Sequence, residues 1–105
     1  MRGETPEIRL NLGCGGRPLP GCINIDMDSL ERLKARYPQQ EFPPDVRIYN
    51  FDILNLPFPD NSVAEVRADS LIEHLSFLEE PKFFYEVKRV LRPSGIFVFS
   101  TPDFE

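Results

Sequence analysis

The sequence predicts an α/β fold: a doubly wound, mostly parallel sheet of about five strands, formed as a single domain over residues 1–105. Three observations predict it. Short apolar runs of strand length alternate along the chain with crossover segments, some of which have helical periodicity, and this is the element order of a parallel sheet. The last apolar run, Ile96–Phe99, is continuous rather than alternating, as in a strand covered on both faces. The length of 105 residues suits one compact domain.

The strands before Ile96 are expected wherever a short apolar run is bounded by turn residues. Each of these runs is too short for a helix, and glycine, proline, aspartate or asparagine stands at its ends. The second of them ends in an acid, and the third and fourth are each followed directly by one. We expect these strands at Ile8–Leu12, Ile23–Asp26, Val46–Phe51 and Val63–Ala68.

The first helix is expected after the second strand. Asp28–Glu31 has the pattern of a capping box with Asp28 as the cap and an acid three residues later. Apolar residues then recur at helical spacing until Pro38 ends the pattern. The sequence therefore predicts two to three helical turns in this segment.

The second helix is expected before the last strand. Pro81 suits a first helical position, and the apolar residues that follow it form one face until Pro93 stops the helix. Ser94 and Gly95 are then expected to turn the chain into the strand. The segment Leu71–Leu78 is expected to be partly helical.

Composition excludes several classes of protein. The net charge of −5 disfavours a protein that binds nucleic acid by covering phosphates with Lys and Arg. No apolar run approaches the length that spans a bilayer, and Met1–Glu7 lacks the apolar core of a signal peptide, so we expect no membrane segment and a cytoplasmic location. Cys14 and Cys22 have no CxxC spacing and no nearby His, so neither a disulfide framework nor a metal site is expected.

The strongest local signal for chemistry is Leu10–Gly16, a strand that runs into a glycine cluster. Glycines let backbone amides approach a ligand closely, although a glycine turn without a ligand is equally compatible with this segment alone. Asp26, at the end of the next strand, adds support because an acid there can accept hydrogen bonds from both hydroxyls of a ribose. Asp26 or its neighbour Asp28 could equally be a helix-capping acid.

The type of nucleotide follows from what the glycine cluster lacks. A dinucleotide site needs a third glycine and a helix whose N-terminus faces the pyrophosphate. Pro18 stands at that glycine position, and Pro18 with Pro20 leaves no room for a helix before Ile23. A nicotinamide-dependent oxidoreductase is therefore disfavoured, and a ligand with a ribose but no phosphate, such as S-adenosylmethionine, is favoured.

Further pieces of sequence follow the glycine cluster in a characteristic order. They are Ile23–Asp26, Asp52 followed by Leu56–Val63, Ile72–Leu75, and Glu86–Gly95 leading into Phe97–Pro102. Together with Leu10–Gly16 they resemble the class I S-adenosylmethionine-dependent methyltransferases. The resemblance runs from Ile8 to Asp103 and implies a Rossmann-like fold, S-adenosylmethionine as cofactor and methyl transfer as the activity.

The resemblance also implies which residues bind the cofactor. Its glycine loop would surround the methionine end, the acid after the second strand would bind the ribose, the residues after the third strand would bracket the adenine, and those after the fourth would lie beside the reactive methyl. Asp52 could instead cap a turn, and Ala68–Ser70 could be an ordinary strand-to-helix junction. The implied cofactor-binding residues are Asn11, Gly13, Cys14, Gly15, Asp26, Met27, Asp52, Ile53 and Asp69.

The sequence departs from the family pattern at three places. Asn11 replaces an acid that is frequent in the first strand, and the segment from Gly13 to Asp26 is too short for the usual first helix. The chain also stops at Glu105, before the last strands of the full fold. We therefore expect the Ile96–Phe99 edge to be covered by a homodimer contact or by a partner, unless the chain is a fragment of a longer reading frame.

The predicted function is methyl transfer from S-adenosylmethionine to a small molecule or glycan precursor, with no nucleic-acid partner. A general base is optional in this chemistry, because the sulfonium is already an activated leaving group. His74 is the only histidine and a weak candidate for a base; the simpler interpretation is a partly exposed helical residue. The alternative function is a non-catalytic S-adenosylmethionine-binding module, or a remnant that needs a partner.

Overall fold

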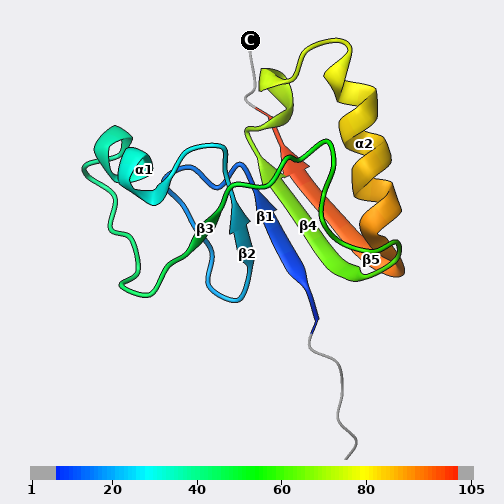
Figure 1. The fold of residues 1–105 in the computed structure, drawn as a ribbon, viewed down its shortest axis with the longest axis horizontal. Helices are drawn as coiled ribbons and strands as arrows, with labels where there is room; N and C mark the ends of the chain where they lie inside the picture. The colour runs from blue at the N-terminus through cyan, green and yellow to red at the C-terminus, as the bar shows by residue number, and fades with distance from the viewer. Residues whose placement is uncertain (1–6, 102–105) are drawn as a thin grey trace, which may run out of the picture.

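The computed structural model of the chain describes residues 7–101, and its centre is one five-stranded parallel sheet in the order β3-β2-β1-β4-β5. All neighbouring strands run in the same direction, which confirms the predicted α/β class (Figure 1). Residues 1–6 and 102–105, including Pro102 and Asp103 of the predicted motifs, lie outside the described part. The elements are β1 (Arg9–Leu12), β2 (Ile23–Ile25), α1 (Leu30–Arg36), β3 (Ile48–Tyr49), β4 (Val63–Asp69), the 3-10 helix η1 (Ile72–His74), α2 (Glu79–Val90) and β5 (Leu91–Ser100).

β3 is shorter than the predicted Val46–Phe51, because only Ile48 and Tyr49 pair, with Asn24 and Ile25 of β2. β2 itself has three residues, so it offers little backbone for a longer partner. Directly after β3, the Asn50 amide donates to the carbonyl oxygens of Asp26 at 2.7 Å and of Asp28 at 3.1 Å. The side chain of Asn50 thus continues the connection after the strand ends.

The sequence predicts Asp28 as the N-terminal cap of α1. In the structure, Ser29 is the cap instead. The Ser29 hydroxyl accepts a hydrogen bond from the Arg32 backbone N–H at 3.2 Å. Asp28 is buried and pairs with Arg36 at 2.6 Å, at the far end of the helix. A buried carboxylate needs a charged partner, and this long-range pair draws Asp28 away from the capping position.

α2 and β5 differ from the prediction at the boundary between them. α2 begins at Glu79, which places Pro81 at the third helical position, still in the first turn where a missing N–H costs nothing. The helix ends at Val90, and β5 begins with the next residue, so Pro93 is not the residue that stops the helix. Val63 pairs with Leu91 but Glu65 pairs with Ile96, so the intervening β5 residues bulge out of register.

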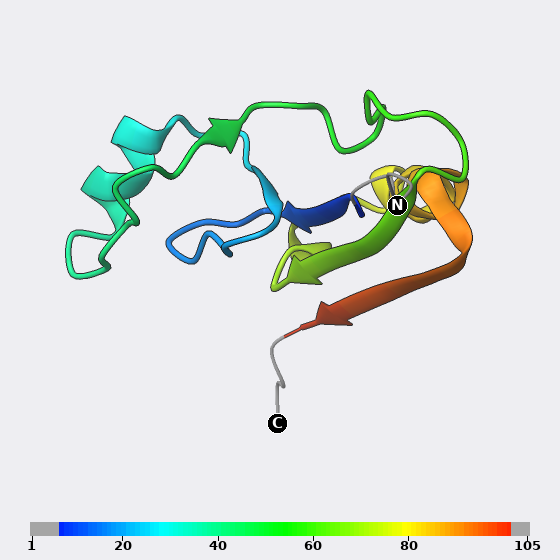
Figure 2. The same cartoon turned by 90° about the horizontal axis from the view of Figure 1, so that it is seen from below.

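The two faces of the sheet differ in cover. One face carries Leu10, Leu12, Val66 and Ala68, all without exposed surface, and packs against α2 through Phe83 and its neighbours. Figure 2 shows α2 and the segment before β4 on this side and no helix of residues 7–101 directly against the other. In β5, Ile96 is 57% and Val98 41% exposed, so the expectation of a strand covered on both faces is wrong for the described residues.

An ion pair within α2 is hydrogen-bonded to the segment that precedes β4. Glu86 is buried on α2, and one of its carboxylate oxygens accepts the Leu56 backbone N–H at 2.7 Å. Arg89 donates five hydrogen bonds, to both Glu86 oxygens, to the carbonyls of Leu56 and Phe58, and to the Asp60 carboxylate. We call this set of contacts the Arg89 clamp. It ties residues 56–60 to the helix.

We expect Arg89→Ala to destabilise the fold, because it leaves the buried Glu86 carboxylate without its charged partner and frees two carbonyls. In urea denaturation the midpoint should fall well below that of the wild type. The matched control is Lys88→Ala, which removes an exposed neighbouring cation and should leave the midpoint almost unchanged. Equal midpoints for Arg89→Ala and Lys88→Ala would show that the clamp contributes nothing to stability.

The clamp should also make stability depend on pH. The hydrogen bonds from Arg89 hold the pKa of Glu86 below its usual value of 4.5. A pKa that is lower in the folded state adds stability that is complete above pH 4.5 and is lost as the pH falls below that value. Glu86→Gln should therefore lose less stability than the wild type between about pH 6 and about pH 3, as measured by urea denaturation at each pH. Parallel losses in both proteins would contradict this assignment.

Candidate active site

Two connected hollows lie at the carboxyl edge of the sheet, where β1, β2 and β4 end. The first, which we call the Asp26 lobe, has a volume of about 530 Å³, and the second, the Arg17 lobe, has about 750 Å³. Both volumes are in the range of small-molecule sites. Parallel sheets bind ligands at this edge, where the strand order reverses. Here the reversal lies between β1 and β4.

The glycine loop after β1 forms the floor shared by both lobes. Gly13 and Gly15 have φ angles of 65° and 53°, a left-handed conformation that favours glycine. The backbone N–H groups of Gly13 and Cys14 both donate to the Ile25 carbonyl, at 2.7 and 3.2 Å. A Cβ on Gly13 would come within 3.1 Å of Leu71. The loop is thus held close to the end of β2 and has little room for side chains.

Asp26 is half-buried in the first lobe, and both of its carboxylate oxygens face backbone N–H groups. One oxygen accepts from Gly15 at 2.9 Å and the other from Asp28 at 3.0 Å. A carboxylate oxygen can accept more than one hydrogen bond, so the side chain still has acceptor capacity toward the lobe. The structure therefore brings Asp26 and the glycine loop together as the sequence analysis expected.

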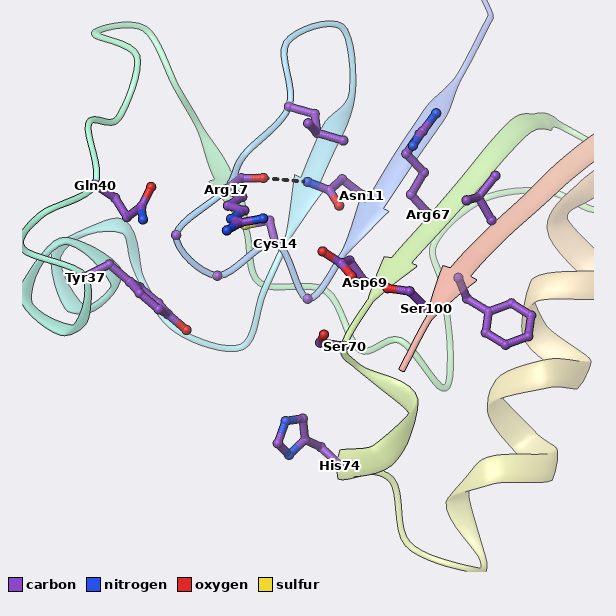
Figure 3. Close-up of a pocket in the computed structure, with 16 residues that line it drawn as sticks. Asn11, Cys14, Arg17, Tyr37, Gln40, Arg67, Asp69, Ser70, His74 and Ser100 are labelled. Carbon is purple, nitrogen blue, oxygen red and sulfur yellow. Dashed lines mark hydrogen bonds between the residues drawn. The ribbon is translucent and has the colours of Figure 1, made fainter. Parts of the chain in front are cut away.

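Asn11 is buried and its amide is occupied within the protein. It donates to the Asn24 side chain at 2.9 Å and to the Arg17 carbonyl at 3.2 Å, and Asn24 in turn accepts from the Leu19 N–H at 2.8 Å. Asn11 also lines the Arg17 lobe (Figure 3). Its principal contacts nevertheless hold the loop between β1 and β2, a role that the sequence analysis did not assign to it.

Cys14 lies in the same loop and is 6% exposed. Burial and the nearby negative charge of Asp26 raise the pKa of its thiol to about 12. The thiol is therefore protonated at neutral pH and unsuited to act as a nucleophile. Cys14 lines the Arg17 lobe as a small apolar wall.

The remaining predicted residues are divided between the lobes. Met27, Asp52 and Ile53 line the Asp26 lobe, where an oxygen of Asp52 accepts the Leu54 N–H at 2.9 Å as in a local turn. Asp69 lines the Arg17 lobe and accepts a hydrogen bond from the Ser100 hydroxyl. Asp52 thus makes the turn that was its alternative interpretation and also faces the lobe.

His74 lies where the two lobes meet and is largely exposed, 3.9 Å from the Glu73 carboxylate. Figure 3 shows its ring extending from η1 into the open side of the site. This agrees with the simpler interpretation of an exposed residue, and its position leaves it within the candidate site.

Several residues of the site were not predicted. Leu71 and Leu75 follow β4 in a segment for which the sequence predicts only partial helix, and Phe51 is the last residue of the predicted strand Val46–Phe51. Tyr37 is the last of the apolar residues at helical spacing before Pro38, which predicts only a helical position. A hydrophobic period gives no information on which nonlocal cavity a residue borders. Ser70, part of the predicted Ala68–Ser70 junction, lines both lobes. The unpredicted residues that line a lobe are Gly16, Arg17, Leu19, Arg36, Tyr37, Gln40, Phe51, Leu54, Arg67, Leu71, Leu75, Glu79, Val98, Phe99 and Ser100.

Two negative findings concern residues 7–101 alone. No helix in that range is long and apolar enough to cross a membrane. The same residues contain no group of three or more His, Cys, Asp or Glu side chains placed to hold a metal ion.

Comparison with known proteins agrees with this geometry. Residues 10–99 match the family model described as a methyltransferase domain. The chain is 39% identical to a Mycolicibacterium smegmatis protein named "Probable S-adenosylmethionine-dependent methyltransferase", over 97% of this chain and 44% of that protein. A similarly named Mycobacterium tuberculosis protein is 33% identical over 94% of this chain and 37% of its own length. The chain thus spans less than half the length of these curated relatives.

Solved structures share the fold. A Pyrococcus horikoshii protein superposes with a TM-score of 0.64 at 25% identity, covering 90% of this chain and 49% of that one. The YcgJ protein of Bacillus subtilis gives a TM-score of 0.62 at 26% identity, covering 90% and 44%. With the family model matching nearly the whole described range, this chain belongs to the methyltransferase domain family, of the class I, S-adenosylmethionine-dependent type.

Proposed function

We propose that this chain is the cofactor-binding core of an enzyme that transfers a methyl group from S-adenosylmethionine to a small molecule or glycan precursor. The observation that carries the proposal is the Asp26 carboxylate, fixed against the glycine loop by the Gly15 N–H and facing a lobe of small-molecule size. Membership of the family supplies the identity of the cofactor.

The residues of the Asp26 lobe fit an adenosine group. Asp26 offers oxygen acceptors for the two ribose hydroxyls, and apolar side chains of Phe51, Ile53 and Leu71 line the same space, as a flat base requires. Gly13 and Gly15, which have no side chains, lie at its floor. No helix stands between β1 and β2, so the glycine loop offers no helix N-terminus to a pyrophosphate, which agrees with a ligand that has none.

When bound, S-adenosylmethionine supplies a methyl group attached to a positively charged sulfonium sulfur. As the acceptor atom bonds to the methyl carbon, the bond from that carbon to sulfur breaks and the sulfur leaves as a neutral thioether. The residues of the chain then have to align the acceptor, exclude water and, where the acceptor carries a proton, pass that proton to a base or to solvent. The Arg17 lobe borders the glycine loop and is the larger of the two lobes, so it has room for an acceptor group beside the amino-acid end of the cofactor. The acidic charge of the chain favours an acceptor other than nucleic acid.

Asp26→Ala should weaken binding of S-adenosylhomocysteine by about thirtyfold, since it removes charge-assisted hydrogen bonds worth ~2 kcal/mol. Calorimetric titration measures the dissociation constant, with NAD as a ligand that should not bind. Asp45→Ala, which removes an exposed acid outside both lobes, is the matched control. An Asp26→Ala variant with wild-type affinity would place the ribose elsewhere, and a folded wild type that binds no S-adenosylhomocysteine would overturn the proposed function.

The β5 edge is proposed as the contact with a second copy or another partner. Ile96, Val98 and Phe99 are exposed apolar residues on this edge strand, and such edges are normally covered in stable proteins. We expect light scattering to give a mass above that of a monomer, and Ile96→Lys to reduce it by placing charge in the contact. A monomeric wild type that binds no apolar dye would exclude this contact.

A further inference from the structure

Five residues line both lobes: Gly13, Gly15, Tyr37, Ser70 and His74. We call this set the seam. A ligand that extends from one lobe to the other has to pass these residues. Tyr37 is the only seam residue that combines an aromatic ring with a hydroxyl, and it belongs to neither the glycine loop nor the strand ends.

The backbone of Tyr37 is fixed at the end of α1. It is the residue that caps the helix, and its N–H donates to the Leu33 carbonyl at 2.9 Å. Leu33 is fully buried, so this end of the helix is anchored in the interior. The Tyr37 carbonyl accepts the Gln40 N–H at 3.1 Å, which closes the following turn. The side chain therefore starts from a well-defined point beside the site.

The glycine loop accommodates the ring of Tyr37. A Cβ on Gly16 would lie 2.7 Å from Cγ of the tyrosine, so any side chain there would displace the ring. A Cβ on Gly15 would lie 3.3 Å from the hydroxyl oxygen. The ring thus runs along the loop from Gly16 to Gly15, and the oxygen is the part of the side chain that reaches the seam.

The hydroxyl of Tyr37 makes no hydrogen bond to another residue of 7–101 that meets normal geometry. Figure 3 shows it pointing away from α1, toward the side of the site where Ser70 and His74 lie. A half-buried phenol that is held by packing and has no protein partner can offer its oxygen lone pairs to a ligand. The part of the ligand that meets the Tyr37 oxygen would be the part that crosses the seam.

We propose that the Tyr37 hydroxyl oxygen faces the sulfonium of the cofactor and gives the site its preference for the charged S-adenosylmethionine over the neutral S-adenosylhomocysteine. The inference rests on the proposed function, which places adenosine in the Asp26 lobe. With adenosine there and the amino-acid end in the Arg17 lobe, the sulfur that joins them lies at the seam. A lone pair directed at positive charge in a partly enclosed site is attractive, whereas the thioether of the product gains little from it.

The test compares two ligands that differ in charge. Calorimetric titration of S-adenosylmethionine and S-adenosylhomocysteine into the wild type and Tyr37→Phe gives the ratio of their dissociation constants. We expect Tyr37→Phe to weaken binding of the sulfonium ligand by about threefold to tenfold, as for loss of one modest polar contact, and to leave the thioether ligand unchanged. Tyr85→Phe, which removes an exposed phenol on α2 outside both lobes, should change neither.

A second variant moves the oxygen without removing it. Gly16→Ala places a methyl group against the Tyr37 ring, so the same selective loss of the charged ligand is expected. An equal change in both affinities, or no change, in Tyr37→Phe would overturn the proposal while leaving the adenosine site intact. A folded wild type that binds neither ligand would instead overturn the proposed function, and the assignment of Tyr37 with it.

Discussion

The structure of the site depends on the pairing of β1 with both β2 and β4. This pairing aligns Leu12 with Ile25 on one side and with Ala68 on the other, so that three strands end at the same level. Gly13 directly follows β1, Asp26 directly follows β2, and Asp69 is the last residue of β4. These three residues lie at one edge of the sheet although they are far apart in the sequence. The candidate site is therefore a consequence of sheet register, and a slip of one residue would move every member of it.

Two buried amide side chains hold the short connection between β1 and β2 in place. No helix links β1 to β2, and residues 13–22 make the connection without regular secondary structure. The buried amides of Asn11 and Asn24, which face each other across the strand pair, hold the loop through the backbone of Arg17 and Leu19. A buried, hydrogen-bonded polar pair specifies one geometry more strongly than apolar contacts do, and here it holds a connection that contains no helix.

The sequence was sufficient to predict the parallel sheet, the glycine loop and the place of Asp26, since these follow from local patterns of apolar runs, glycines and acids. It was insufficient where a nonlocal partner decides. Asp28 pairs with Arg36 and leaves the cap to Ser29, and the two-residue β3 is limited by the length of β2. Tyr37 fits an apolar helical stripe, so its contact with Gly15 and Gly16 could not be inferred from its spacing.

The Arg89 clamp and the candidate site use different ends of one segment. Residues 51–54 line the Asp26 lobe, whereas Leu56, Phe58 and Asp60 are bound by Arg89 on the covered side of the sheet. No residue of the clamp lines either lobe. Stability and ligand contact are thus separated along the segment: Arg89 fixes the part from Leu56 to Asp60 against α2, and residues 51–54, whose turn is closed by Asp52, line the lobe.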